Sequence, residues 1–340
     1  MPQQQRVLVT GAGGQLGSHV LRKYQDLGLD GVAICGLVSD KENASQPRIT
    51  VKGSIQLVPC NLTDKEKLSE VVTAFSPTVV IHTAAITAVG YAFDHELETH
   101  AVNVGATQSL VDIIQSLPHP CTIVYISTDM VFDGKLKELP PQLADGRPRC
   151  GYVEHDAPAP LSVYGRSKLE GEQVVLNGTK HGVVVRVPLM FGVADGTKAS
   201  SGGTFQSQWE SLMQGKDVVG FADETRTPLW YGDAAACLHL LAGKAEDLVA
   251  AGNRLIHLAG TERLTRVQML ETMKLLSEER LGKQCSSTIV RKSRNDFPGE
   301  PRAEDLSLDT TLFQRIAGRS PCGTFEVSLK AALGHWLETQ

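Results

Sequence analysis

Short apolar runs alternate with amphipathic stretches through the first half of the chain. The apolar runs are rich in β-branched residues, which is typical of parallel strands covered on both faces. They occupy residues 6–10, 32–38, 55–58, 79–83, 122–126 and 183–187. The stretches between them have helical periodicity, at residues 15–27, 65–74, 101–117 and 163–176. This alternation, with right-handed crossovers, predicts an α/β fold built on a Rossmann doubly wound parallel sheet.

The pattern changes after Pro188, where helical periodicity dominates. Helices are predicted at residues 204–215, 233–245, 266–281 and 325–337, and a strand that extends the sheet at residues 254–259. We therefore expect a smaller, mostly helical C-terminal lobe. Residues 133–160 interrupt the earlier rhythm with a stretch rich in Pro, Gly and charge. Connections of that length tend to be functional or mobile.

Composition removes several function classes. The net charge is −5, so no basic field is present to attract nucleic acid or an anionic membrane. No apolar run is long enough to span a bilayer, and residues 1–6 leave no room for a signal peptide, so we expect a cytoplasmic protein. The seven cysteines are scattered and lack a C-x-x-C pair, which argues against a disulfide framework and a metal site. Those in apolar runs are predicted core residues, namely Cys35, Cys60, Cys121 and Cys237.

The strongest chemical motif follows the first predicted strand. Gly11, Gly14 and Gly17 lie three residues apart between that strand and the helix that begins at Gln15 and Leu16. Such a turn needs residues without a β-carbon, so that a pyrophosphate can approach the backbone and the helix can pack closely on the strand. Backbone N–H groups and the helix dipole then hold the anion. The motif predicts a dinucleotide-binding site.

The end of the second strand bears on the choice of dinucleotide. An acid there holds the ribose 2′-hydroxyl of NAD and repels the 2′-phosphate of NADP. Gly36 occupies the position expected for that acid, and Ser39 can donate to a phosphate, which favours NADP. Asp40 is the alternative ribose partner, so NAD stays open.

Two further strand ends carry candidate cofactor contacts. After the third strand, Asn61 can bond the adenine edge while Leu62 covers its face; the alternative is that Thr63 or Asp64 caps the next helix. After the fourth strand, small residues let a cofactor lie against the backbone, at Ala84 and Ala85. His82, beside them, is interpreted as a packed strand residue.

Tyr164 and Lys168 lie four residues apart and share one face of a predicted helix. A free tyrosine is a poor proton donor at neutral pH, but an adjacent ammonium favours its phenolate form. Tyr164 can then pass a proton to a carbonyl oxygen while a hydride arrives. The hydroxyl of Thr128, or alternatively of Ser127, at the end of the fifth strand would hold that oxygen in place.

At this point the chain resembles the extended short-chain dehydrogenases/reductases, and more narrowly the dTDP-4-dehydrorhamnose reductase (RmlD-like) group. The motifs that carry the resemblance are residues 11–17, 84–89, 127–134, 160–168, 186–188 and 226–228. A branch of that group, the regulatory β subunit of methionine adenosyltransferase, shares Gly36, Pro188 and the 260–265 pattern.

The resemblance implies a role for each matched position. The catalytic places fall on Thr128, Tyr164 and Lys168, with Tyr164, Lys168 and Pro188 also beside the cofactor. Substrate contacts fall on Thr87, Val89, Thr128, Asp129, Met130, Leu189 and Arg226. The domain division this implies is a nucleotide-binding domain at 1–187, rejoined by 229–260, and a substrate-binding lobe at 188–228 and 261–340.

Departures from the family pattern leave the function open. Met130 and Leu189 stand where the sugar-nucleotide reductases tend to carry aromatic residues, and Met130 also replaces the Glu that a 4,6-dehydratase uses. The leading hypothesis is an NAD(P)H-dependent reductase of a keto sugar nucleotide or a related carbonyl compound. A regulatory subunit of methionine adenosyltransferase, with that synthetase as partner, and a sugar-nucleotide epimerase are the alternatives. A homodimer is also left open.

Overall fold

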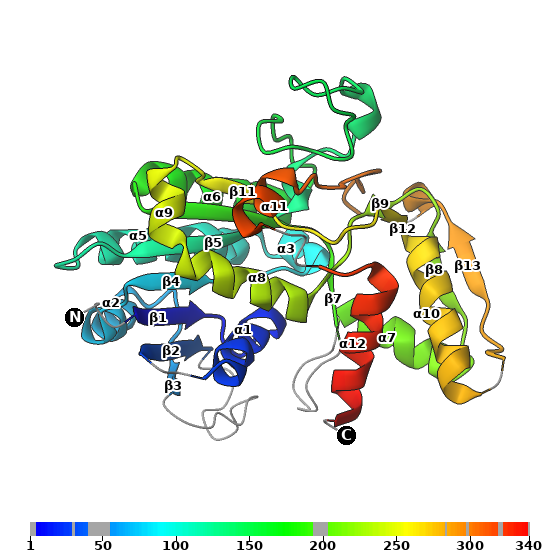
Figure 1. Cartoon of the computed structure of the whole chain (residues 1–340), viewed down its shortest axis with the longest axis horizontal. Helices are drawn as coiled ribbons and strands as arrows, with labels where there is room; N and C mark the ends of the chain where they lie inside the picture. Colours follow the sequence, from blue (N-terminus) through cyan, green and yellow to red (C-terminus); the bar gives the residue numbers. More distant parts are fainter. Residues whose placement is uncertain are drawn as a thin grey trace. The chain divides into compact units, whose positions relative to one another are not determined.

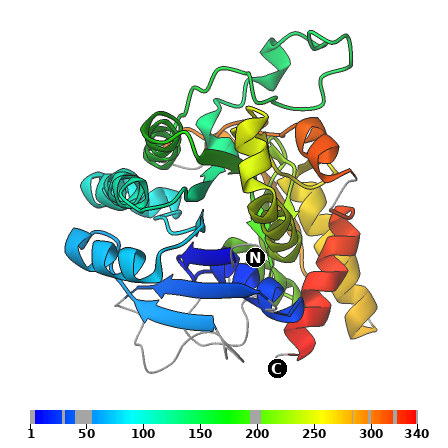
Figure 2. The same cartoon turned by 60° about the vertical axis from the view of Figure 1, so that its left-hand side comes forward.

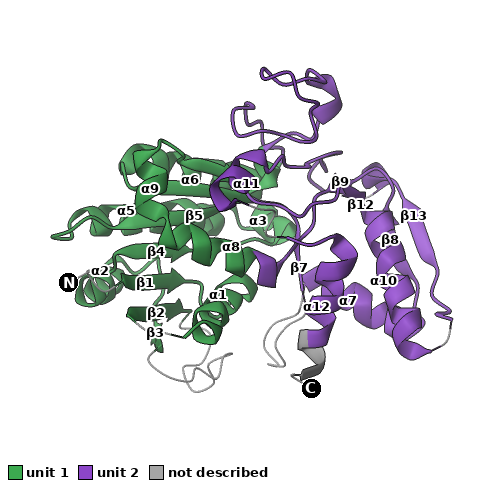
Figure 3. Ribbon diagram, in the orientation of Figure 1, with its two compact units in different colours: residues 1–131, 162–186, 234–256 green, residues 132–161, 187–233, 257–340 purple. Residues whose placement is uncertain are grey.

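The structure is a computed structural model, and it describes residues 5–28, 31–39, 55–192, 203–282, 284–296, 299–318 and 322–338. The chain divides into two compact units, coloured separately in Figure 3. Unit 1 comprises Met1–Val131, Ser162–Arg186 and Ala234–Ile256. Unit 2 comprises Phe132–Leu161, Val187–Asp233 and His257–Gln340, so the Pro- and Gly-rich insert is grouped with unit 2.

A seven-stranded sheet in the order β11-β6-β5-β4-β1-β2-β3 forms the centre of unit 1 (Figure 1). Its strands are β1 (Gln5–Thr10), β2 (Val32–Val38), β3 (Ile55–Pro59), β4 (Val79–His82), β5 (Thr122–Thr128), β6 (Gly182–Val187) and β11 (Leu255–His257). β1 pairs in parallel with β2 on one side and with β4 on the other. The chain therefore moves outward from β1 to β3 and then crosses back to β4, which makes the β1–β4 boundary the topological switch point. The predicted Rossmann doubly wound α/β fold is confirmed.

Helices cover both faces of this sheet. They are α1 (Gln15–Asp26), α2 (Lys65–Phe75), α3 (Val89–Asp94), α4 (Glu96–His100), the π-helix η1 (Ala101–Gly105), α5 (Ala106–Gln115), α6 (Val163–Gly178), α8 (Tyr231–Gly243) and α9 (Ala245–Ala250). α2, α5 and α6 lie on one face, and α1 and α8 on the other (Figure 2). The helix predicted at 101–117 is real, but its first turn is π-helical rather than α-helical.

Two polar side chains start the helices that matter most for the site. Ser162 caps α6 by accepting a hydrogen bond from the Gly165 amide at 3.0 Å. Asp64 caps α2 by accepting one from the Lys67 amide, also at 3.0 Å. Each cap satisfies an amide that the helix itself cannot, and so defines where the helix begins.

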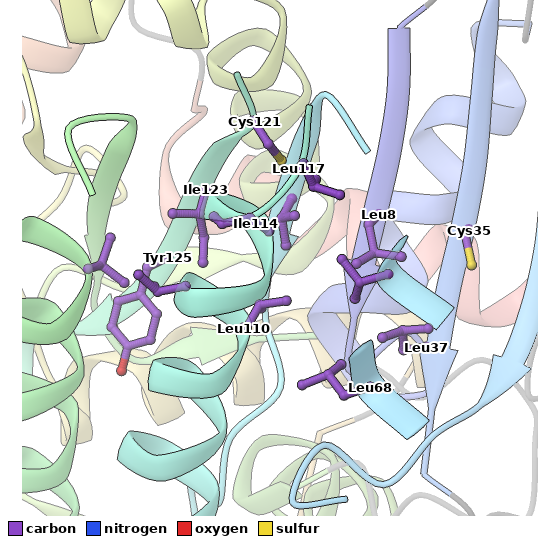
Figure 4. Packing of buried hydrophobic residues seen from close by; sticks show 14 of the residues in the cluster. Leu8, Cys35, Leu37, Leu68, Leu110, Ile114, Leu117, Cys121, Ile123 and Tyr125 are labelled. Atoms are coloured by element: carbon purple, nitrogen blue, oxygen red, sulfur yellow. The ribbon is translucent and has the colours of Figure 1, made fainter. Parts of the chain in front are cut away.

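The core beneath α2, α5 and α6 joins sheet and helices into one apolar layer, shown in Figure 4. Leu8 and Ile123 from the sheet pack there with Leu68 of α2 and Leu110 of α5. Burial of such side chains stabilises by about 25 cal/mol per Å² of apolar surface removed from water. The prediction that four cysteines are core residues is confirmed, because Cys35, Cys60, Cys121 and Cys237 are all buried.

Unit 2 is built mainly from helices around short strand pairs. Its helices are α7 (Gly203–Met213), α10 (Arg266–Leu281), α11 (Thr311–Ala317) and α12 (Phe325–Glu338). Its strands are β7 (Met190–Phe191), β8 (Val218–Phe221), β9 (Thr225–Arg226), β10 (Leu229–Trp230), β12 (Leu264–Thr265) and β13 (Ile289–Lys292). Trp209, Leu270, Met273 and Leu329 are the centre of its core.

Among the described residues, none of the helices combines the length and apolar character needed to cross a membrane.

Candidate active site

The glycine turn between β1 and α1 is folded so that two of its glycines cannot be replaced without a clash. Gly11 has φ +64°, and a β-carbon there would lie 2.8 Å from the Ala84 backbone. A β-carbon on Gly17 would come within 3.0 Å of the Gly11 carbonyl oxygen. Gly14 is less constrained, since its β-carbon would meet that oxygen at 3.2 Å. The turn thus packs closely both on the segment that follows β4 and on α1, and its glycines present backbone groups rather than side chains.

The N-terminus of α1 suits an anion. Gly14 is the N-cap residue and supplies no side-chain hydrogen bond, and the first turn of α1 contains no acidic residue. The start of the helix, at Gln15 and Leu16, therefore carries no side-chain cap from Gly14 and no carboxylate in its first turn. A helix start of this kind is a favourable position for a phosphate group.

The second strand places Gly36 inside the sheet rather than at its tip. A β-carbon on Gly36 would lie 2.7 Å from Leu57 and 2.8 Å from Ala12, so close packing accounts for this glycine. β2 ends at Val38, and Ser39 follows it on the surface. Ser39 is therefore the residue at the strand tip, not Gly36. Asp40 lies outside the described residues.

In the loop after β3, the Asn61 side chain forms hydrogen bonds within the loop itself. The Asn61 carboxamide oxygen accepts hydrogen bonds from the Thr63 amide at 3.1 Å and from the Thr63 hydroxyl at 2.9 Å. Asp64, not Thr63, caps α2. Leu62 packs partly against the core of unit 1.

The end of β4 is bonded to the end of β1 through Thr10. The Ala84 amide donates to the Thr10 hydroxyl at 3.2 Å, and the Thr83 hydroxyl donates to the Thr10 carbonyl at 2.6 Å. These bonds hold the segment that includes Ala84 and Ala85 beside Gly11. The Ala84 backbone thus borders the glycine turn at the switch point of the sheet.

His82 is a packed strand residue, as predicted. Its Nδ1 lies 2.6 Å from the Thr10 hydroxyl and its Nε2 3.0 Å from the Thr107 hydroxyl. Burial, and then the Lys168 ammonium, lower the pKa of His82 to about 3. The ring is therefore neutral at physiological pH and links β1, β4 and α5.

Asn103, in the π-helical turn, connects the loop after β4 to α6. Its carboxamide oxygen accepts from the Ile86 amide at 2.8 Å. Its Nδ2 donates to the Ile86 carbonyl at 3.0 Å and to the Ser167 hydroxyl at 2.9 Å. Ser167 in turn donates to the Tyr164 carbonyl at 2.8 Å. One side chain thereby fixes the helix that carries Tyr164 against the loop that leads to Thr87.

Tyr164 lies in a small apolar cluster of unit 1. Val89 and Met130 pack around it, with Ala92 and Val163. Two of the residues predicted to contact substrate are thus beside the predicted catalytic tyrosine. Thr87 is exposed on the same loop.

Lys168 follows Tyr164 by one turn of α6 and is almost wholly buried, with 2% of its surface exposed. Its Nζ lies 4.0 Å from the centre of the Tyr125 ring. Burial lowers the pKa of Lys168 to about 7, and the Glu172 carboxylate opposes that fall. An ammonium with this pKa can change its protonation near neutral pH, which is the range that general acid–base chemistry requires.

The two hydroxyls at the end of β5 have different partners. Ser127 donates to the Glu172 carboxylate at 2.5 Å. The Thr128 hydroxyl donates to Asp129 at 3.2 Å and accepts from the Met130 amide at 3.2 Å. Successive residues of a strand point to opposite faces, so only one of the pair can lie with Glu172.

The sequence interpretation did not identify Glu172 or its partner Arg186 as site residues. Arg186 donates through Nε and Nη2 to the two Glu172 oxygens, at 2.8 and 2.7 Å. The spacing of Glu172, four residues after Lys168 and eight after Tyr164, places it on the same helix face and is the signal that could have found it.

The remaining predicted site residues belong to unit 2. Pro188 is buried and Leu189 is partly buried against the unit 2 core. Arg226 is 7% exposed, and its guanidinium donates to the carbonyls of Thr225 at 2.7 Å and Ala303 at 3.4 Å. These bonds give Arg226 a structural role within its own unit.

The chain is similar in sequence to known proteins over most of its length. The sequence profile described as RmlD substrate binding domain matches residues 5–335. Methionine adenosyltransferase 2 subunit beta of Danio rerio is 30% identical, over 78% of this chain and 71% of the relative. dTDP-4-dehydrorhamnose reductase of Aggregatibacter actinomycetemcomitans is 29% identical, over 70% of this chain and 68% of the relative.

Solved structures share the fold over nearly the full length. dTDP-4-dehydrorhamnose reductase from Bacillus anthracis in complex with NADP has a TM-score of 0.69 at 20% identity, covering 97% of this chain and 99% of that one. UDP-glucose 4-epimerase from Thermotoga maritima, crystallised with UDP-glucose, has a TM-score of 0.77 at 19% identity, covering 98% and 99%. Likenesses at these identities support the fold alone.

The doubly wound sheet and the glycine turn at its switch point define a protein of the Rossmann-fold class. Within that class, the chain belongs to the RmlD substrate binding domain family.

Proposed function

We propose that the chain is an NAD(P)H-dependent reductase of a keto sugar nucleotide or a related carbonyl compound. The observation that carries the proposal is the buried Lys168 one helical turn from Tyr164, with the Thr128 hydroxyl on the neighbouring strand end. Membership of the RmlD family and the similarity to dTDP-4-dehydrorhamnose reductase support the substrate class.

The glycine turn fits a dinucleotide, because close packing at Gly11 and Gly17 keeps side chains off the turn and because α1 begins without a side-chain cap. The residues proposed to hold it in unit 1 are Gly11, Gly14, Gln15, Leu16, Gly17, Ser39, Asn61, Leu62, Ala84, Ala85, Tyr164 and Lys168. Pro188, from unit 2, and Asp40 complete the proposed set. Ser39 at the tip of β2 favours NADP, with NAD as the alternative.

The proposed chemistry assigns one task to each side chain. A dinucleotide held by these residues would supply the hydride that the carbonyl carbon accepts. Tyr164 transfers its phenolic proton to the carbonyl oxygen, so that the C=O bond becomes CH–OH, and it regains a proton from solvent. Lys168 as an ammonium stabilises the phenolate left on Tyr164. Thr128 donates a hydrogen bond that holds the carbonyl oxygen in place.

Substrate contacts are proposed at Thr87, Val89, Asp129 and Met130 in unit 1. Val89 and Met130 support this assignment because both pack around Tyr164. Leu189 and Arg226 are the proposed contributions of unit 2. For Arg226 the bonds to Thr225 and Ala303 favour an indirect contribution, through the shape of its loop.

The test is turnover of keto sugar nucleotides by wild type and Tyr164→Phe, followed by oxidation of NADPH or NADH. Loss of the proton donor should lower kcat about 10²- to 10⁴-fold while cofactor affinity is retained. Tyr24→Phe is the matched control, because Tyr24 is buried in α1 on unit 1. Activity retained in Tyr164→Phe overturns the mechanism, and a wild type inactive on every such nucleotide overturns the function.

A second candidate, a nucleotide-binding regulatory subunit, is favoured by a specific observation. The 30% identical relative is named as a subunit of methionine adenosyltransferase 2, so a synthetase is a candidate partner. Size-exclusion chromatography with a methionine adenosyltransferase should then give one peak and altered synthetase kinetics. Two separate peaks with unchanged kinetics contradict this candidate, and the same column reports whether the chain alone is a homodimer.

An epimerase is the third candidate, supported by the likeness in fold to UDP-glucose 4-epimerase. A sugar-nucleotide epimerase retains its oxidised cofactor, so nicotinamide should copurify with the protein. Purified protein free of nicotinamide absorbance contradicts it.

A further inference from the structure

Glu172 is a buried carboxylate that accepts three hydrogen bonds from two side chains. Only 2% of its surface is exposed, and the side chain of Arg186 is as deeply buried. The Arg186 guanidinium binds both carboxylate oxygens in a fork, and the Ser127 hydroxyl donates to one of them at 2.5 Å. Three charge-assisted hydrogen bonds of this kind fix the position of a carboxylate.

The same carboxylate acts on Lys168, one turn earlier on α6. Lys168 is buried, and burial alone favours the neutral amine. Glu172 is the charged group that raises the pKa of Lys168 against that effect. Without it, the ammonium would lose its compensation in a site where Lys168 meets an aromatic ring rather than water.

The other groups that face Lys168 do not supply a negative charge at neutral pH. His82 on β4 is neutral, because burial and Lys168 itself lower the pKa of its ring to about 3. Tyr125 on β5 is also neutral, since burial and then Tyr164 and Glu172 raise the pKa of its phenol. Arg186 on β6 is bound to Glu172 and contributes a positive charge beyond it.

From this arrangement we infer that Glu172 is a positioning residue: it keeps Lys168 protonated beside Tyr164, and Ser127 and Arg186 hold its carboxylate in place. The inference rests on the proposed reductase function only for its catalytic consequence. It also separates the two hydroxyls at the end of β5, because Ser127 serves Glu172 and leaves Thr128 for the substrate.

The test is a direct titration of Lys168 by NMR in protein labelled with ¹³C-lysine. Lys168→Arg identifies the signal. In Glu172→Gln the titration midpoint of Lys168 should fall by about one pH unit or more, a tenfold change in its acid dissociation constant. Glu170→Gln is the matched control, because Glu170 lies on the same helix with its side chain 47% exposed and bound to His100 at 3.1 Å. In Glu170→Gln the titration midpoint of Lys168 should equal that in the wild type.

A conservative variant and a double variant complete the set. Glu172→Asp keeps the charge and should restore the midpoint most of the way to the wild-type value. Glu172→Gln/Arg186→Met removes both charges, so that neither is left buried alone, and its downward shift should be smaller than that of Glu172→Gln because the positive charge of Arg186 is lost as well. An unshifted Lys168 in Glu172→Gln, once its fold is verified by circular dichroism, overturns the inference.

Turnover supplies an independent readout. Reduction requires protonated Lys168, so the loss of kcat at rising pH should begin about one pH unit lower in Glu172→Gln than in wild type. The NMR titration needs no substrate. An inactive wild type with a shifted Lys168 therefore contradicts the proposed function and upholds the inference, whereas an active enzyme with an unshifted Lys168 does the reverse.

Discussion

The carbonyl oxygen of Gly11 lies so close to the Cα of Gly17 that a β-carbon at residue 17 would come within 3.0 Å of it. Both atoms belong to backbone, so neither can move without opening the turn or lifting α1 from the sheet. The third glycine of the motif is different, because a β-carbon on Gly14 would keep 3.2 Å from the same oxygen. The three glycines are equivalent in sequence but not in space.

Gly17→Ala should therefore destabilise the protein and weaken dinucleotide binding, whereas Gly14→Ala should cost less on both counts. Forcing one extra carbon against backbone costs about 1–3 kcal/mol. Urea unfolding gives the stability of each variant, and fluorescence titration with NADPH gives the affinity. Equal losses in the two variants would show that the tight contact at Gly17 is not what the motif requires.

At Gly171, in α6, helix propensity and side-chain packing predict opposite effects of an alanine substitution on stability. In a helix interior, Gly→Ala ordinarily stabilises by up to about 1 kcal/mol. Here a β-carbon would come within 3.0 Å of the Tyr125 hydroxyl, and Tyr125 is wholly buried. We expect Gly171→Ala to destabilise by about 1–3 kcal/mol, because the ring has no space into which it can move.

Tyr125→Phe tests the cause of that loss. Removing the hydroxyl relieves part of the clash, so Gly171→Ala should cost less in the Tyr125→Phe background, and the double-mutant cycle should give a coupling of about 0.5 kcal/mol or more. Additive effects would mean that the glycine is required for some other reason.

Most of the central fold could be predicted from the hydrophobic pattern alone. The strand predicted at 32–38 and the helix predicted at 266–281 have the observed bounds, β2 (Val32–Val38) and α10 (Arg266–Leu281). Long segments with a clear period carry their structure locally. β8 and β13 were not predicted, because each has only four residues and is stabilised by a partner about seventy positions away, as in the pair Ile289–Val218.

The candidate site was predictable as a set of residues but not as a set of contacts. Tyr164 and Lys168 share a helix face by spacing alone, whereas the lowered pKa of Lys168 depends on burial under β5, which no local pattern encodes. The choice between Ser127 and Thr128 likewise needed the position of Glu172. Gly36 was expected to occupy the strand-tip position of the ribose-binding acid, whereas it lies inside β2, where close packing against Leu57 and Ala12 excludes a side chain.

His82 should make the stability of the protein depend on pH. Its folded pKa of about 3 lies below the value of about 6.5 for an unfolded histidine, so the unfolded state binds a proton first. The contribution is complete above pH 6.5 and is lost progressively as the pH falls towards 3. Between these limits the wild-type free energy of unfolding should fall more steeply than that of His82→Gln, by up to about 1.4 kcal/mol per pH unit.

Denaturant unfolding of both proteins at a series of pH values measures this difference. His155→Gln is the comparison variant, since His155 is exposed. Parallel curves for wild type and His82→Gln would mean that the buried ring is protonated in the folded protein as well.

In the insert at residues 133–160, the side chain of Arg147 reaches the start of α11. Arg147 binds Asp309 at 2.6 Å and the Thr311 hydroxyl at 2.9 Å, and Asp309 has only 4% of its side chain exposed. Although burial opposes it, hydrogen bonds from Thr311 and Arg147 hold the pKa of Asp309 below its ordinary value. Arg147→Ala leaves that carboxylate buried with one partner fewer, which should cost about 1–3 kcal/mol and release the insert locally.

Hydrogen exchange should then accelerate at two amides within the insert. The Leu143 amide donates to the Arg147 carbonyl, and the Gly146 amide donates to the Leu143 carbonyl. Arg280→Ala, at an exposed arginine in the last turn of α10, should leave both stability and exchange unchanged. Because a carboxylate with a depressed pKa stabilises only while ionised, the contact between Arg147 and Asp309 should also weaken in wild type as the pH falls below about 4. If Arg147→Ala leaves exchange at the two amides unchanged, other contacts suffice to hold the insert. One such contact is the hydrogen bond from the Tyr152 amide to the Ser307 carbonyl, at 2.7 Å.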